Sequence, residues 1–387
     1  MAPKYIPNDL PLQSLDREPL PLMKSSLERI LKATPPQPAY LDPAQHGGFI
    51  RGPTSIAYLF FRLANLYPDV QVADHHLLHW AKKYMQADRG KLALSTRVGL
   101  SCEKLAYEAL KACISQDAND VESFLSNIPR IVGPYPDGEK DPFESEIWQG
   151  RAGTLYFMRL MRHQLPDCAG ILEGPIAQVS EKILADSIDG DEGGWTFHQK
   201  KYLGAGHGDI GIVTQLALTT PALAPKLAPK LRALLSLQRD GNWPIAREID
   251  ESRHPSLMQW CHGAPGFLYS LRAMRPCFPD LHDEIDAAIA RGQEAIWRQG
   301  LLRKEPSLCH GIFGNALNLP HGPRREHFLS LATEEAVKAA KSVDPDVFSP
   351  ADYGHGMSLL FNYHSSAAWA WAVCESDNPP MIAYTDV

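Results

Sequence analysis

Seven glycine-led apolar segments recur along this chain of 387 residues, at intervals of 45 to 58 residues. Each glycine precedes an apolar run long enough for a buried helix, and a more polar amphipathic segment follows it. A repeat of this length indicates an array of supersecondary units, here pairs of helices. The glycines are Gly52, Gly99, Gly150, Gly208, Gly263, Gly311 and Gly356.

The two helices of each pair differ in how much surface they can expose. Segments as apolar as 56–66 or 154–161 have to be covered on most sides, so the glycine-led helices are predicted to be inner and their partners outer. Seven such pairs can stack into an open solenoid or close into a ring, and spacing alone does not separate these architectures. In a closed ring the glycine turns would meet at one mouth, where residues distant in sequence come together.

Two of the turns carry the same Cys-His-Gly triplet, beginning at Cys261 and at Cys309. Thiolate and imidazole are ligands that zinc prefers, and three protein ligands with an open fourth position are typical of a catalytic zinc site. Cys261, Cys309 and His310 are therefore the candidate metal ligands. The alternative is that both cysteines are buried apolar residues, which is the usual role of a free cysteine. Both triplets are followed by a second glycine at the same spacing, and this match favours the metal site over the apolar interpretation.

Composition restricts the class of protein. Hydrophobic residues make up 44% of the chain and charged residues 21%, which is ordinary for a globular protein. A net charge of -7 gives no reason to expect nucleic acid or an anionic membrane as partner. The seven cysteines form no short-range disulfide pattern, and no stretch reaches the ~18 apolar residues that span a bilayer. We expect a soluble, cytoplasmic protein without a transmembrane segment.

Proline content and the repeats suggest three regions. Residues 1–45 are predicted to be a proline-rich arm followed by a first outer helix. Residues 46–375 would contain the helical repeats, and residues 376–387 would form a C-terminal tail.

Several motifs around the glycines resemble signatures of the lanthionine synthetase C-like (LanC-like) family, especially of its eukaryotic branch. The resemblance covers roughly residues 50–375, with the motifs in the family's order. It implies an all-α fold, an α/α toroid of seven inner and seven outer helices, with zinc held by Cys261, Cys309 and His310. The motifs are GRAGTLY at 150–156, YLGAGHGDIGI at 202–212, DGNWP at 240–244, WCHGAPG at 260–266 and LCHGIFGN at 308–315.

The resemblance also implies a reaction. In bacterial members of the family, zinc activates a peptide cysteine thiol for addition to dehydroalanine or dehydrobutyrine; in eukaryotic members, glutathione takes the place of the peptide thiol. His207 matches the family's active-site histidine and would supply the proton that such an addition requires. Glu146 falls where the family has an acidic residue, and it could orient His207. Lys304 matches a lysine that is associated with glutathione.

Each of these residues also has a simple structural interpretation. His207 could cap or pack at a turn, Glu146 could favour the start of a helix through the helix dipole, and Lys304 could be a solvated surface charge. Two departures from the family also weaken the assignment of glutathione. The last repeat has His355 where the family tends to carry an acid, with no arginine upstream, and Leu257 stands where bacterial cyclases have an arginine.

Three functions therefore remain open. The first is a thioether-forming enzyme of the LanC-like cyclase or glutathione-transferase type. The second is a non-catalytic zinc- and glutathione-binding sensor or scaffold protein. A carbohydrate- or isoprenoid-processing toroid is a third interpretation by architecture alone, and no paired-carboxylate motif supports it.

Overall fold

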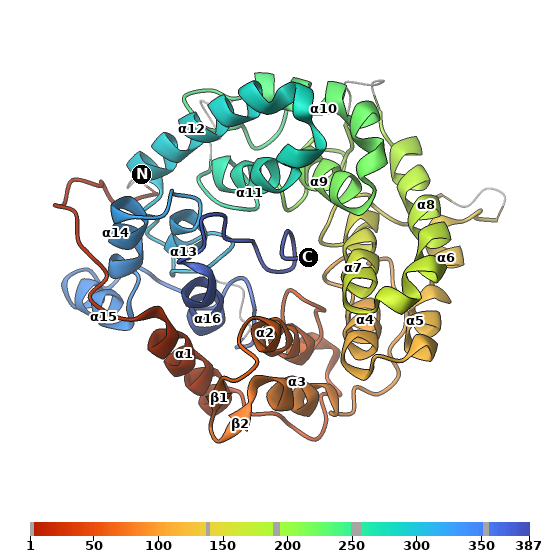
Figure 1. Ribbon diagram of the computed structural model, residues 1–387, viewed down its shortest axis with the longest axis horizontal. Helices are drawn as coiled ribbons and strands as arrows, with labels where there is room; N and C mark the ends of the chain where they lie inside the picture. The colour runs from red at the N-terminus through yellow and green to blue at the C-terminus, as the bar shows by residue number, and fades with distance from the viewer. Residues whose placement is uncertain (1–3, 137–139, 189–193, 249–256, 351–355) are drawn as a thin grey trace.

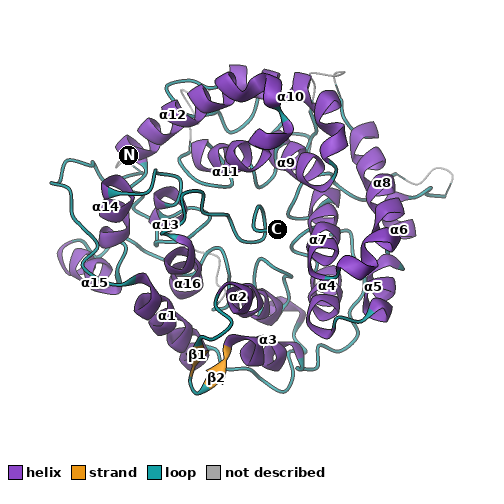
Figure 2. Ribbon diagram, in the orientation of Figure 1, coloured by secondary structure: helices purple, strands orange, loops and turns teal. Residues whose placement is uncertain are grey.

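The structure is a computed structural model that describes residues 4–136, 140–188, 194–248, 257–350 and 356–387. Within these residues the helices form an inner and an outer ring (Figure 1). The described strands, β1 (Gln71–Val72) and β2 (His75–His76), pair into one short antiparallel hairpin (Figure 2). The chain is therefore all-α, as predicted. His355 lies outside the described residues.

The inner ring contains the apolar helix of each repeat. These helices are buried on nearly all sides, because each packs against its neighbours in the ring and against an outer helix. Within the described residues they are α2 (Pro53–Leu66), α4 (Glu103–Ser115), α7 (Arg151–Gln164), α9 (Asp209–Thr219), α11 (Ala264–Met274), α13 (Ile312–Ala316) and α16 (Tyr363–Val373).

The outer ring contains the more polar helices, and each inner helix packs against one of them. The partners of α2, α4, α7 and α9 are, in order, α3 (Leu77–Met85), α5 (Ala118–Leu125) followed by α6 (Ile128–Val132), α8 (Ala169–Ala185) and α10 (Ala224–Ser236). Those of α11, α13 and α16 are α12 (His282–Gln299), α14 (Pro323–Leu331) followed by α15 (Glu334–Val343), and α1 (Pro19–Ala33). The predicted toroid of seven inner and seven outer helices is confirmed.

The ring is closed by contacts between the two ends of the chain. Helix α1 packs on α16, so the first helix in sequence is the outer partner of the last inner helix. The amide of Gly52 donates to the carbonyl of Met357 at 2.9 Å, and the amide of Leu359 donates to the carbonyl of Ile50 at 3.2 Å. These contacts exclude the open solenoid that the repeat spacing allowed.

The glycines mark the inner helices with two exceptions. Gly52, Gly150, Gly208, Gly263 and Gly311 are the N-cap residues of α2, α7, α9, α11 and α13. Helices α4 and α16 begin later than predicted, after Cys102 and Asn362 instead of directly after Gly99 and Gly356. Gly99 has a different role, because a Cβ there would lie 2.4 Å from the carbonyl oxygen of Ile147 in the next repeat.

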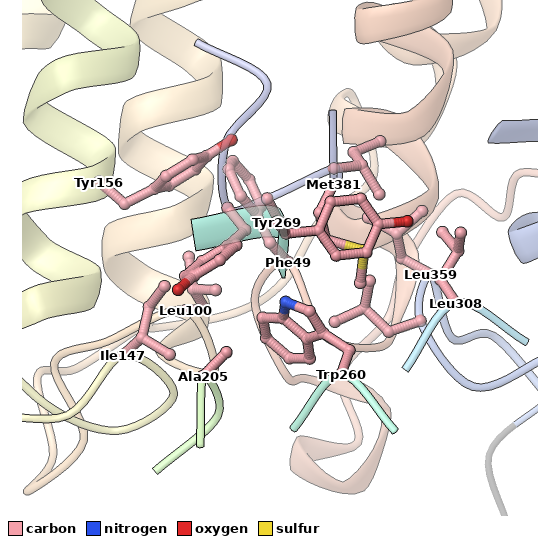
Figure 3. Packing of buried hydrophobic residues seen from close by; sticks show 14 of the residues in the cluster. Phe49, Leu100, Ile147, Tyr156, Ala205, Trp260, Tyr269, Leu308, Leu359 and Met381 are labelled. Carbon is pink, nitrogen blue, oxygen red and sulfur yellow. The ribbon is translucent and has the colours of Figure 1, made fainter. Parts of the chain in front are cut away.

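The centre of the ring is filled by the C-terminal segment, which ends there (Figure 1). Met381, Ile382 and Tyr384 are fully buried. Met381 lies in one hydrophobic cluster with Phe49 and Trp260, which come from distant parts of the chain (Figure 3). Residues 376–387 are therefore not a peripheral extension of the ring. The division of the chain into three regions itself remains a prediction.

A buried ionic cluster anchors this segment. The hydroxyls of Tyr58 and Tyr156 each donate to the Asp386 carboxylate at 2.7 Å, and Arg62 Nε lies 3.0 Å from the same carboxylate. Burial raises the pKa of both tyrosines well above the usual range, and the charge of Asp386 adds to this effect. Both tyrosines therefore remain neutral donors. The segment is also held by Arg159, which donates to the carbonyl of Tyr384 at 2.8 Å.

The N-terminal arm lies along the outside of the ring. The amide of Ile6 donates to the carbonyl of Leu301 at 2.7 Å, and the Asn8 side chain donates to the carbonyl of Trp297 at 2.9 Å. No helix in the described part of the chain is long and apolar enough to cross a membrane.

We predict that Asp386→Ala destabilises the protein by about 3 to 5 kcal/mol, because it leaves the buried charge of Arg62 without its partner. Asp377→Ala, an exposed change in the same segment, is the control and should alter stability by less than about 0.5 kcal/mol. Urea denaturation measures both. Equal stability of the two variants would contradict the anchoring role of Asp386.

Candidate active site

Backbone hydrogen bonds join the turns that precede the inner helices. The amide of Trp260 donates to the carbonyl of Cys309 at 2.7 Å, and the amide of Gly206 donates to the carbonyl of Cys261 at 3.3 Å. The predicted site residues occupy these turns: Glu146 precedes α7, His207 precedes α9, Cys261 precedes α11, and the Cys309–His310 pair precedes α13. Residues separated by more than 100 positions in sequence are thus brought to one end of the ring.

Glycine is required where these turns pass closest to one another. Gly263 has φ of +105°, and a Cβ there would lie 1.8 Å from the carbonyl oxygen of Leu257. A Cβ on Gly206 would lie 2.9 Å from the Cβ of Cys261. Neither position has room for a larger residue unless its neighbours shift. The glycines thus allow the cysteine-bearing turn to lie directly against its neighbours.

Cys261 and Cys309 are both buried, and their thiols lie close enough for each to act on the pKa of the other. Hydrogen bonding to Cys309 lowers the pKa of Cys261, although burial opposes this shift. Burial raises the pKa of Cys309 well above its usual range, and the contact with Cys261 adds to this effect. The two thiols together therefore lose their first proton more readily than their second. Sulfur donors are soft ligands of the kind that zinc prefers.

His310 follows Cys309 and is also buried, with its ring stacked on Phe361 at 5.3 Å between centroids. Burial lowers the pKa of His310 to about 3, so the imidazole is neutral, which is the form that binds metals. Within the described residues, however, no group of three or more His, Cys, Asp or Glu side chains is arranged to hold a metal ion. The two thiols are brought together, and His310 as a third ligand stays a prediction.

Glu146 and His207 form a pair beside the thiols. Glu146 is almost fully buried, and its carboxylate accepts hydrogen bonds from the amides of Trp148 at 2.7 Å and Gln149 at 2.5 Å. The same carboxylate lies 3.1 Å from Nδ1 of His207, which is 21% exposed. His207 Nε2 is therefore the ring nitrogen left for other partners. The predicted contact between Glu146 and His207 is present in the structure.

Lys304 is linked to the cysteines through Gln259. Its ammonium donates to Gln259 Oε1 at 3.4 Å, and Gln259 Nε2 donates to Cys261 Sγ at 3.0 Å. Gln259 is buried and orients the sulfur of Cys261. Sequence reasoning missed Gln259. Its only signal in the sequence was its position two residues before Cys261, beside residues whose chemistry is more distinctive.

An aromatic wall surrounds His207. The imidazole stacks on Phe197 with ring centroids 4.5 Å apart, and the ring of Trp148 lies 5.2 Å from it. Trp148 also lies 5.4 Å from Phe361, which comes from the last repeat. None of these three aromatic residues was predicted, because no spacing pattern distinguishes them from aromatic residues of the core.

His262 directly follows Cys261 and lies near this group of rings. Its ring lies 6.2 Å from that of His207. Burial lowers the pKa of His262 to about 4, and the nearby charge of His207 adds to this shift. His262 is therefore a neutral part of the wall.

These features define a class of protein: a closed α/α toroid with a thiol pair and a carboxylate-imidazole pair at the turns of its inner helices. Comparison with known proteins agrees with this class. A family model described as lanthionine synthetase C-like protein matches residues 45–320. The chain belongs to this family, as predicted from its motifs.

Two curated relatives and one solved structure are similar to the chain. Glutathione S-transferase LANCL1 of Danio rerio is 29% identical over 261 residues, which are 60% of this chain and 56% of that protein. LanC-like protein GCL1 of Arabidopsis thaliana is 32% identical over 187 residues, 44% of this chain and 40% of that protein. The chain thus spans about half the length of these relatives. The structure of nisin cyclase matches with a TM-score of 0.54 at 14% identity, covering 93% of this chain and 94% of nisin cyclase.

We predict that Gly263→Ala destabilises the protein by at least about 1 to 3 kcal/mol, because alanine is strained at this φ and has no room for its Cβ. Gly170→Ala is the control. Gly170 lies in α8 with no atom within 4 Å of the added Cβ, so this change should be neutral or stabilise by up to about 1 kcal/mol. In thermal denaturation, the melting temperature should fall for Gly263→Ala and should stay the same or rise for Gly170→Ala. A fall for both variants would argue against strain at Gly263.

Proposed function

We propose that this protein adds a thiol, glutathione or a peptide cysteine, to dehydroalanine or dehydrobutyrine in a zinc-dependent reaction. The observation that supports this function best is the meeting of the Cys261 and Cys309 thiols beside the Glu146–His207 pair. Membership of the LanC-like family and the similarity to a protein named glutathione S-transferase support the same reaction class.

The residues at the site fit zinc by their chemistry. Cys261 and Cys309 would hold it through sulfur, and His310, buried and neutral, would be the third ligand. When bound, zinc would supply the Lewis acidity that deprotonates a substrate thiol near neutral pH. Gln259 would keep the sulfur of Cys261 oriented through its hydrogen bond.

His207 and Glu146 would handle the proton of the addition. As the C–S bond forms at the β-carbon, the electron pair of the double bond moves toward the α-carbon and the adjoining carbonyl. His207 Nε2 would then protonate the α-carbon, which completes the addition. Glu146 would hold the ring through Nδ1 and keep Nε2 directed toward the substrate. The proton released by the thiol returns the imidazole to its starting state.

Lys304 would bind a carboxylate of the thiol substrate. Its ammonium lies close enough to Cys261, Cys309 and His310 for its charge to act on all three. A carboxylate paired with Lys304 would therefore place its thiol near the two cysteines. This assignment suits glutathione, which carries carboxylates at both ends.

We predict that the protein forms an adduct between glutathione and a dehydroalanine peptide, detected by mass spectrometry. His207→Ala should slow adduct formation by about 100- to 10,000-fold, the usual contribution of a general acid. His163→Ala, an exposed histidine at the end of α7, is the control and should leave the rate unchanged. Equal rates for the wild type and His207→Ala would contradict the role of His207.

We also predict that the purified protein contains one zinc ion per chain, and that Cys261→Ala and Cys309→Ala each lose it. Cys277→Ala, a half-buried cysteine away from the mouth, should retain it. Metal analysis of the four proteins checks this outcome. Zinc without any thiol adduct would favour the alternative, a non-catalytic zinc- and glutathione-binding sensor or scaffold protein.

A further inference from the structure

A cavity lies between the first two repeats, and one of its lining residues, Ser101, is bonded through its backbone to Trp148 of the candidate site. Its volume is about 360 Å³, so it can hold a side chain and part of a peptide. Its wall combines the loop that joins α3 to α4 with the first turn of α4. Lys91, Arg97, Lys104 and Ser101 are among its lining residues.

The charge of this cavity is positive. Glu103 is the acidic residue that lines it within the described part of the chain, and its carboxylate is already fully engaged. It accepts from the amides of Gly47 at 3.1 Å and Gly48 at 2.9 Å, from Thr54 Oγ1 at 2.5 Å and from Arg89 Nε at 3.1 Å. Arg89 and Glu103 thus neutralise each other, and the remaining lining charges are cationic.

Two of these cations have no acidic partner in the part of the chain that the structure describes. Lys104 pairs with Glu108 at 2.6 Å, but neither Lys91 nor Arg97 forms an ion pair with any described residue. Both side chains belong to exposed residues. The guanidinium of Arg51 is also near: burial lowers the pKa of Arg51, and the charge of Arg97 adds to this shift. Lys91 and Arg97, two exposed cations without a described counter-charge, favour the binding of an anion.

A hydroxyl is available on the inner wall of the cavity. Ser101 Oγ is buried and has no hydrogen-bond partner among the described residues, although a buried hydroxyl is normally paired. It could donate to a bound anion that Lys91 and Arg97 attract.

The cavity adjoins the side of the mouth that holds His207. The amide of Ser101 donates to the carbonyl of Trp148 at 2.8 Å, and the Trp148 ring lies 5.2 Å from that of His207. Lys304, the residue proposed to bind the thiol substrate, instead contacts Gln259 on the side of the cysteines. A ligand that extends from the cavity to His207 would, in the proposed reaction, be the partner that receives the proton.

We propose that the cavity lined by Lys91, Arg97 and Ser101 binds an anionic side chain, carboxylate or phosphate, of the polypeptide that carries the dehydroamino acid. The role of this polypeptide as acceptor rests on the proposed function, whereas its binding does not require the reaction. An anionic group held here would place a neighbouring part of the same peptide over Trp148 and toward His207.

The test uses three fluorescein-labelled peptides of equal length that contain no dehydroamino acid and differ at one position: serine, glutamate or phosphoserine. Fluorescence anisotropy should show that the glutamate or the phosphoserine peptide binds the wild type about 5- to 10-fold more tightly than the serine peptide at low salt. This preference should fall as salt is added, because the cations are exposed. The tighter of the two acidic peptides identifies the anion.

The double variant Lys91→Gln/Arg97→Gln should remove the preference. Lys32→Gln/Arg298→Gln is the control, since it changes the net charge equally at exposed positions of α1 and α12 and should retain the preference. Ser101→Ala should weaken binding of the preferred acidic peptide and leave that of the serine peptide unchanged. Thermal denaturation verifies that each variant is folded.

Equal affinity for all three peptides, or an equal loss in the pocket and control variants, would overturn the proposal. Because the peptides cannot react, these outcomes are independent of the adduct assay. An inactive protein that keeps the preference for acidic peptides would refute the proposed reaction but not the proposed anion-binding site.

Discussion

Two backbone hydrogen bonds, from Gly52 to Met357 and from Leu359 to Ile50, join the first repeat to the last. The pairs that meet at the mouth come from consecutive repeats: Glu146 with His207, and Cys261 with Cys309. Closure brings the last repeat to the same place, because the ring of Phe361 lies 5.4 Å from that of Trp148. In an open solenoid these two rings, which belong to the last and the third repeat, would remain apart.

The closed ring has to fill its own centre, and the chain does so with its last residues. Asp386 accepts hydrogen bonds from the hydroxyls of Tyr58 and Tyr156 and forms an ion pair with the guanidinium of Arg62, so its buried charge is compensated. The mouth is different, because Glu146 is held by backbone amides while His207 remains partly exposed. The same scaffold therefore presents a rigid polar centre and an accessible imidazole.

Much of the candidate site could be predicted, because its residues belong to short motifs. Cys261, Cys309, His207 and Glu146 all occur within a few residues of a glycine turn, and the structure brings the two thiols together and pairs the carboxylate with the imidazole. His310 as a zinc ligand and Lys304 as a substrate-binding residue are still predictions about chemistry. Gln259, Trp148 and Phe361 could not be predicted, since their roles arise from contacts between different repeats.

The sequence by itself determined the helical pairs, the inner and outer order of the helices and most turn positions, because apolar periodicity and glycine act over a few residues. It also determined the family, through motifs that are local in the chain. Only the tertiary structure decided that the ring closes through α1 and α16, and that residues 376–387 enter its centre. These features depend on packing between segments more than 300 residues apart, and no local pattern in the chain records such contacts.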